Sequence, residues 1–200
     1  MTKHNTKSKI VFDISMSLDG FITASNRSAE EPMGAGGHLL HDWVMDSGDS
    51  RNRKLLEESG QNLGAVITGR VTYDDSIPWW GENGPTGLAR IPVFVLTHQV
   101  PENVPKNGVY SYVTNGIESA LEQTKVVADG KDICIMGGAN VFQQFILAGL
   151  VDEISIHLVP VIFGDGIRLF DKLEDKHIRL EPVTMIDTSK ETHLKYRVLK

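Results

Sequence analysis

The chain has 200 residues, of which 40% are hydrophobic and 23% are charged, which is ordinary for a globular protein. Its formal net charge of −6 and its lack of a dense basic segment argue against nucleic-acid binding. It has one cysteine, Cys134, and no apolar run near the about 20 residues that span a bilayer, so we expect a cytoplasmic protein with no membrane partner.

The first half of the chain is predicted to alternate between strands and helices. Residues 1–8 are polar and are expected to form a flexible tail, whereas residues 18–37 form a long glycine-rich stretch that predicts a functional loop. Hydrophobic periodicity and capping residues predict the remaining elements. They are strands at residues 9–17, 63–69 and 91–98, helical segments at residues 38–46, 49–61 (capped by Asp49 or Ser50) and 70–77, and a loop at residues 78–87.

The second half of the chain ends in consecutive strands. The expected elements are helices at residues 115–129 and 139–149, strands at residues 108–113, 132–136 and 151–164, and a closing hairpin at residues 177–187 and 191–200. Strands that first alternate with helices and then follow one another predict a mostly parallel sheet with an antiparallel C-terminal hairpin. We therefore expect one α/β domain at residues 9–200.

Three of the predicted strands end in residues that suit a phosphate group. These residues are Gly69, Arg70 and Thr72 after the first such strand, Thr97 and His98 after the second, and Gly137 and Gly138 after the third. In an open α/β sheet, ligands bind beyond the carboxyl ends of the strands. A glycine lets a phosphate approach the backbone, the following helix offers free N–H groups, and an arginine adds a fork of donors. Each element alone could be a simple turn or a surface charge, but together they predict a phosphate-containing ligand.

Two further patterns leave alternatives open. Trp79 and Trp80 could stack on a flat heterocycle, or they could form a packed corner or a dimer contact. His38 and His41 lie beside Asp42, but no further residues with ligand spacing follow, so no metal site is expected.

The segments "ISMSLDGFIT", "VITGRVTY", "VFVLTHQ" and "IMGGANVFQQFILAGLVDEISIHLVPVIFGDGIRLF", with the closing hairpin, carry a family resemblance. The chain resembles the dihydrofolate-reductase-like superfamily, and most closely its bacterial branch related to the reductase domain of riboflavin biosynthesis, the RibD C-terminal domain. The resemblance implies a three-layer α/β/α fold and a reductase that uses NADP(H) without a separate cofactor domain.

The resemblance also implies roles for particular residues around the cofactor. The phosphates would be held by Gly69, Arg70 and Thr72, the adenosine phosphate would be flanked by Leu96, Thr97 and His98, and the pyrophosphate would be cradled by Gly137, Gly138, Ala139, Asn140 and Val141. The nicotinamide would be lined by Ser15, Ile22 and Thr23, with the loop at residues 18–37 closing over it. In this family the Gly-Gly peptide bond is often cis.

At the substrate end, the resemblance implies that Asp42 is the catalytic acid and that Trp43, Ile77 and Trp80 bind the substrate. A pterin and a ribosylaminopyrimidine phosphate are both candidate substrates. The motif that approaches the acid in pterin reductases is absent, and so is the His/Cys zinc signature of the deaminase half of a complete riboflavin enzyme. A non-catalytic NADP(H)-binding sensor or assembly protein is the alternative. Relatives in this branch are often homodimers, so we expect a homodimer, for which an apolar edge strand within residues 151–164 would provide the contact.

Overall fold

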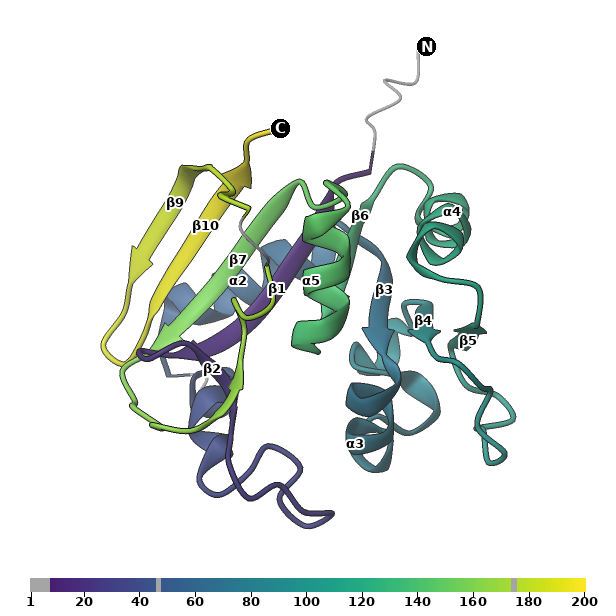
Figure 1. Cartoon of the computed structure of the whole chain (residues 1–200), viewed down its shortest axis with the longest axis horizontal. Helices are drawn as coiled ribbons and strands as arrows, with labels where there is room; N and C mark the ends of the chain where they lie inside the picture. The colour runs from purple at the N-terminus through teal and green to yellow at the C-terminus, as the bar shows by residue number, and fades with distance from the viewer. Residues whose placement is uncertain (1–7, 46–47, 174–175) are drawn as a thin grey trace.

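The computed structural model describes residues 8–45, 48–173 and 176–200, and its centre is an eight-stranded sheet (Figure 1). The strands lie in the order β5-β4-β3-β6-β1-β7-β10-β9. In chain order they are β1 (Ile10–Ser17), β3 (Leu63–Gly69), β4 (Val93–Leu96), β5 (Tyr110–Val113), β6 (Asp132–Met136), β7 (Glu153–Val159), β9 (Leu180–Asp187) and β10 (Thr192–Val198). The pairs from β5 to β7 are parallel, whereas β10 runs antiparallel to both β7 and β9. The predicted parallel sheet with an antiparallel finish is confirmed.

Helices cover both faces of the sheet, as expected for three layers (Figure 1). They are α1 (Asp42–Met45), α2 (Ser50–Gln61), α3 (Arg70–Trp80), α4 (Ile117–Ala128) and α5 (Ala139–Leu147), with short 3-10 turns η1 (Gly37–His41), η2 (Gly81–Asn83) and η3 (Gly87–Ala89). Residues of α4 and α5 pack with Phe12 and Ile67 in the main core on one face. On the opposite face, Tyr73 of α3 packs against Val66 and Val93. No helix among the described residues is long and apolar enough to cross a membrane.

The side chains on the second face of the sheet change from apolar to polar between its two ends. Under α3 it is apolar, but across β1, β7 and β10 it carries polar side chains. Ser15 lies opposite His157, and His157 lies opposite His193, so the three share this face. The buried residue of α2 that faces them is also polar, namely Asn52. A polar face buried under a helix needs internal hydrogen-bond partners, which makes it a candidate for function.

Two short strands were not predicted. The glycine-rich loop at residues 18–37 contains β2 (Phe21–Ala24), which pairs with β8 (Gly166–Arg168) in a separate small sheet. The two backbones approach so closely that a Cβ on Gly166 would lie 2.0 Å from the carbonyl oxygen of Thr23. The β2–β8 pair therefore ties one part of the expected loop to the segment that follows β7.

Two further predictions need correction, and a third falls mostly outside the description. Helix α3 does not end at Ile77 but continues through Pro78 to Trp80, because Ile77 still packs against the Tyr73 cluster. The strand within residues 151–164 is not an edge strand, since β7 lies between β1 and β10, and the edges are β5 and β9. The expected flexible tail at residues 1–8 lies outside the described residues except for Ser8, which is buried. The last residue of the expected helical segment 38–46 also lies outside them.

Candidate functional site

The three predicted phosphate-binding strand ends lie side by side in the structure. Strands β4, β3 and β6 are neighbours and run parallel, so their carboxyl ends share one edge of the sheet. Arg70, after β3, donates from Nη1 to the Thr97 hydroxyl after β4 at 3.4 Å. On the other side of β3, a Cβ on Gly137 would lie 2.8 Å from Cγ2 of Thr72. Segments that are up to about seventy residues apart in the sequence thus form one continuous surface.

Arg70 is held in place by acceptors on two sides. Its Nε donates to the carboxylate of Asp74 at 2.7 Å, one helical turn along α3, and its Nη1 donates to the backbone oxygen of Gln99 at 2.9 Å. The guanidinium lines an open hollow of about 430 Å³, whose other walls come from Asp74 and the segment at residues 99–103. Because Asp74 already balances part of its charge, an anion at this position would compete with that carboxylate for the guanidinium.

The turn between β6 and α5 presents backbone N–H groups. Gly137 and Gly138 have φ values of 73° and 78°, in the left-handed region that side chains rarely adopt. Helix α5 begins at Ala139 without a side-chain cap, and its first intrahelical bond runs from the Phe142 N–H to the Gly138 carbonyl at 3.2 Å. The N–H groups of Ala139, Asn140 and Val141 therefore have no partner within the helix, which suits an anion.

The expected cis bond between the two glycines is wrong. The described residues contain no cis peptide bond, so the Gly137–Gly138 bond is trans. The left-handed conformation of both glycines supplies the sharp turn that the prediction assigned to a cis bond.

Two buried threonine hydroxyls have no hydrogen-bond partner within the described part of the chain. Among the described residues, the Oγ1 atoms of Thr23 and Thr68 are the buried side-chain polar atoms that have no hydrogen-bond partner. A buried polar atom without a partner costs about 1–3 kcal/mol, and a bound ligand can remove that cost. Thr23 was predicted to line the cofactor, and Ile22 beside it is buried. Thr68 was missed, although its place directly before Gly69 at the end of β3 was a usable signal.

The predicted substrate residues lie in two different environments. Trp43 is 4% exposed, and its indole Nε1 donates to the Ser15 hydroxyl at 2.9 Å. Asp42, next to it at the start of α1, is exposed. Ile77 and Trp80 lie on α3, where Ile77 packs against the apolar cluster on β3 and β4. Trp43 packs beside β7 and β10, whereas Ile77 and Trp80 lie on α3, and their shared role stays a prediction.

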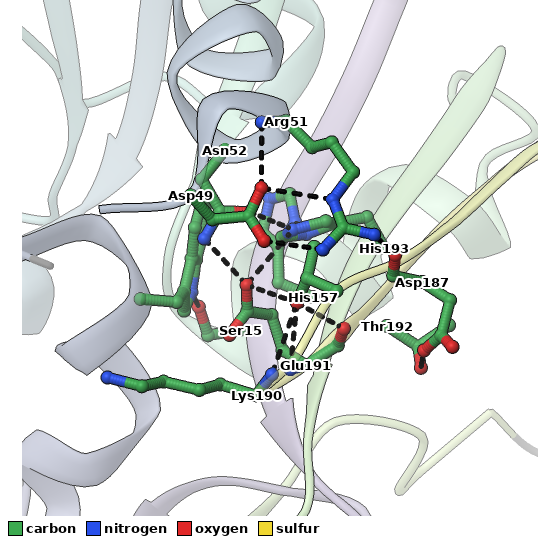
Figure 2. Close-up of polar contacts among 12 residues, drawn as sticks. Ser15, Asp49, Arg51, Asn52, His157, Asp187, Lys190, Glu191, Thr192 and His193 are labelled. Carbon is green, nitrogen blue, oxygen red and sulfur yellow. Dashed lines mark hydrogen bonds and ion pairs between the residues drawn. The ribbon is translucent and has the colours of Figure 1, made fainter. Parts of the chain in front are cut away.

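A buried polar cluster that sequence analysis missed lies beside Trp43, and Figure 2 shows its members His157, His193 and Asn52. The Trp43 ring packs on the rings of His157 and His193, at centroid distances of 4.3 Å and 4.9 Å. Asp13 of β1 and Asn52 of α2 contact these histidines from opposite sides. A sequence signal existed in "ISIHLV", where a histidine lies in a mostly apolar strand, whereas the histidine of "THLK" falls on the polar side of an alternating strand. Their pairing could not be found without the register of β7 and β10.

A hollow of about 260 Å³ opens next to this cluster, lined by Trp43, Gly48, Asp49, Asn52, Ser189, Lys190 and Glu191. The side chain and backbone N–H of Arg51 donate to Asp49 and hold the pKa of that carboxyl at about 2, so Asp49 is a fixed negative charge on the rim. Strand β10 runs antiparallel, so its start lies at the same edge of the sheet as the carboxyl ends of β1 and β7. The hollow and the phosphate-type surface thus lie at one edge of the sheet, on opposite sides of β1.

The sequence profile of the RibD C-terminal domain matches residues 8–194, which is nearly the whole chain. The chain belongs to the RibD C-terminal domain family. The uncharacterized protein YyaP of Bacillus subtilis (strain 168) is 27% identical to it over 183 residues, and the match covers 85% of this chain and 84% of YyaP.

Solved structures share the fold of this RibD C-terminal domain. A candidate riboflavin biosynthesis protein from Shewanella sp. PV-4 has a TM-score of 0.71 at 22% identity, with 96% of this chain and 99% of that chain covered. The deaminase/5-amino-6-(5-phosphoribosylamino)uracil reductase of Thermotoga maritima has a TM-score of 0.67 at 16% identity, with 96% and 57% covered. Dihydrofolate reductase from Enterococcus faecalis, solved with NADP(H), has a TM-score of 0.57 at 14% identity, with 97% and 98% covered. These values confirm the dihydrofolate-reductase-like fold.

The residues of this RibD C-terminal domain fit a dinucleotide cofactor of the NADP(H) type. The Gly137–Gly138 turn and the uncapped start of α5 suit a pyrophosphate. Arg70 offers guanidinium donors beside Thr97 at the adjoining strand ends, where a further phosphate can be held. The unpartnered hydroxyl of Thr23, which is half-buried, offers a polar contact to the rest of such a molecule.

Proposed function

We propose that the chain is an NADPH-dependent reductase that transfers hydride to a small heterocycle of the aminopyrimidine type. The observation that carries the proposal is the adjacency of three phosphate-type strand ends, after β3, β4 and β6, at one edge of the sheet. Membership of the RibD C-terminal domain family supports the aminopyrimidine class over a pterin.

The chain's contribution at the cofactor end is binding and orientation. Gly137 and Gly138, with the amides of Ala139, Asn140 and Val141, would hold the pyrophosphate. Further phosphate contacts would come from Gly69, Arg70, Thr72, Leu96, Thr97 and His98. Ser15, Ile22 and Thr23 would face the nicotinamide, which supplies the hydride when the cofactor is bound.

At the substrate end, the chain would line the binding site with apolar side chains and would supply a proton to the substrate. Trp43 presents a buried aromatic ring beside Ser15, at the position where a heterocycle would meet the nicotinamide. Ile77 and Trp80 would contribute from α3. Asp42 remains a candidate proton donor that solvent also reaches, since its side chain is exposed.

Titration of the purified chain with NADPH and with NADH, followed by calorimetry, tests the cofactor assignment. We expect NADPH to bind at sub-millimolar concentration. Arg70→Ala should weaken that binding about tenfold or more, because it removes charge-assisted hydrogen bonds worth about 1.5–3 kcal/mol. Arg197→Ala, which removes an exposed arginine from β10, is the matched control and should leave NADPH affinity unchanged. Failure of both nucleotides to bind would overturn the proposal.

A non-catalytic NADP(H) sensor is the second candidate, and the exposure of Asp42 favours it. Such a protein would bind NADPH without consuming it. Steady NADPH oxidation with any heterocycle from a small panel, abolished by Arg70→Ala, would eliminate the sensor. Tight NADPH binding without turnover on the whole panel would favour the sensor over the reductase.

A further inference from the structure

The two histidines beside Trp43 contact each other directly. His157 of β7 and His193 of β10 lie opposite each other in the antiparallel pair and are 5% and 3% exposed. Their Nδ1 atoms are 2.7 Å apart, which is the distance of a short hydrogen bond. A hydrogen bond between two imidazole nitrogens needs one hydrogen, so one Nδ1 must donate and the other must accept.

The outer nitrogens of both rings also face acceptors, and Figure 2 shows the one beside His193, Asn52. His157 Nε2 lies 3.0 Å from Oδ1 of Asp13, and a carboxylate can only accept. His193 Nε2 lies 2.8 Å from Oδ1 of Asn52. The orientation of that amide is fixed, because its Nδ2 donates to the carboxylate of Glu191 at 2.7 Å. Both Nε2 atoms must therefore carry a hydrogen.

Counting hydrogens gives the charge of the pair. Two neutral imidazoles carry two hydrogens in total, and both are used at the outer nitrogens. The two Nδ1 atoms would then meet lone pair to lone pair at 2.7 Å, which is repulsive. A third hydrogen on one Nδ1 turns this contact into a hydrogen bond, and it makes one ring an imidazolium.

We propose that His157 and His193 hold one excess proton between them, and that this proton is supplied through Glu191 to a small molecule bound in the hollow beside Trp43. The delivery step rests on the proposed reductase function, because reduction by hydride transfer also consumes a proton. The charge of the pair rests on the hydrogen-bond geometry alone.

The carboxylates that contact the pair favour a positive charge, and the 2.7 Å contact between the two rings opposes a second one. Asp13 from β1 and Glu191 from the start of β10 both contact the rings, and Asp49 and His41 lie farther away. Burial and then the neighbouring His157 lower the pKa of His193. We assign the charge to His157, because its Nε2 lies against the Asp13 carboxylate, whereas the Nε2 of His193 lies against the neutral Asn52 amide oxygen.

A short route leads from the pair to the hollow. His193 Nε2 lies 3.4 Å from Oε1 of Glu191, and Glu191 lines the hollow. His193 can pass its Nε2 hydrogen to Glu191 while it receives the Nδ1 hydrogen of His157, and Glu191 can pass one proton to the bound molecule. Each histidine is then neutral with one hydrogen, and the bond between the rings is kept. The lone pair left free is then on His193 Nε2, which faces the Asn52 oxygen, so a proton from solvent returns to this atom through Glu191 while the Nδ1 hydrogen moves back to His157.

Imidazole proton–nitrogen NMR spectra of the full chain test the charge of the pair. We expect one strongly deshielded N–H resonance near neutral pH that correlates with nitrogens of two different histidines. It should be absent in His157→Gln and His193→Gln and present in His177→Gln, which changes an exposed histidine. The wild-type spectrum is decisive even if a variant does not fold. Two histidines that titrate independently near their ordinary pKa of about 6.5, with no shared resonance, would overturn the proposal.

Turnover tests the delivery step. Glu191→Gln keeps the side-chain volume and should lower kcat about 100-fold or more, the ordinary contribution of general acid catalysis, with NADPH affinity unchanged. Because delivery needs the excess proton, kcat of the wild type should fall as the pH rises and the pair loses that proton. His157→Gln should lower kcat and abolish this pH dependence. An unchanged kcat in Glu191→Gln would overturn delivery through this carboxylate. If NADPH does not bind the wild type, the reductase function and the delivery step both fail, whereas the shared resonance would still establish the excess proton.

Discussion

Gly137 is constrained both by its backbone and by the side chain opposite it. Its φ of 73° disfavours any residue with a Cβ, and a Cβ there would lie 2.8 Å from Cγ2 of Thr72. Gly149 after α5 has a similar φ of 69°, but a Cβ there would meet nothing within 4 Å. The two glycines therefore separate the cost of the backbone conformation from the cost of crowding the turn.

We expect Gly149→Ala to lower the free energy of unfolding by about 1 kcal/mol and to leave NADPH affinity unchanged. Gly137→Ala should destabilise the protein more and should also weaken NADPH binding, because Thr72 or the turn must move. Urea unfolding and calorimetric titration of both variants measure the two effects. Equal NADPH affinities in the two variants would show that the turn after β6 does not contact the cofactor.

Individual residues differ in how far the sequence reveals their role. Gly137 could be predicted, because a glycine pair directly after an apolar run indicates a turn with a backbone that a ligand can approach. The link between Arg70 and Asp74 also follows from helical spacing. The contact between His157 and His193 does not, because it depends on which residues of β7 and β10 lie opposite each other. That register is set by the packing of the whole sheet.

At the scale of elements, an ion cluster joins three strands at the end of the sheet away from the site. Glu153 of β7 accepts from Lys9, before β1, at 2.7 Å and pairs with Lys195 of β10 at 3.1 Å. Burial raises the pKa of the Glu153 carboxyl, but the hydrogen bonds from both lysines outweigh burial, so the pKa is lowered overall. The folded state therefore binds this proton more weakly than the unfolded chain.

A lowered pKa in the folded state means that Glu153 stabilises the protein above its unfolded pKa of about 4.3 and that this stabilisation is lost as the pH falls through the folded pKa. Glu153→Gln should lower the free energy of unfolding at pH 7 by on the order of 1 kcal/mol and should flatten its decline below about pH 5. Glu181→Gln, which breaks an exposed pair with Arg197, is the control and should change little. Parallel pH profiles for wild type and Glu153→Gln would contradict this prediction.

Elements with strong periodicity could be predicted almost to the residue, and the exceptions have physical causes. The run at residues 63–69 matches β3 because every position is apolar or small and the run is bounded by turn signals. β2 and β8 contain four and three residues, too few for an alternating pattern to be visible within a glycine-rich segment. Pro78 predicted the end of a helix, but packing of Ile77 carries α3 one turn further.

At the scale of the whole molecule, the sheet interleaves distant parts of the chain. β1, from the N-terminus, lies between β6 and β7, and β10, from the C-terminus, lies between β7 and β9. The phosphate-type surface and the histidine pair therefore lie on opposite sides of the same central strand, β1. A substitution in β1 could therefore affect both sites. The linear order of the sequence does not indicate this connection.

We propose that residues 9–200 unfold as one cooperative unit, because β1 pairs with both β6 and β7 and so joins the two sides of the sheet through its centre. The tryptophans allow a test, since Trp43 packs beside β7 and β10 whereas Trp79 and Trp80 lie on α3. In a Trp79→Phe, Trp80→Phe double variant, fluorescence reports the histidine side of the sheet alone, and in Trp43→Phe it reports the α3 side alone. Within each variant, the fluorescence and far-ultraviolet circular dichroism midpoints in urea should coincide. A fluorescence transition that precedes the loss of secondary structure in either variant would show that one side of the sheet unfolds separately.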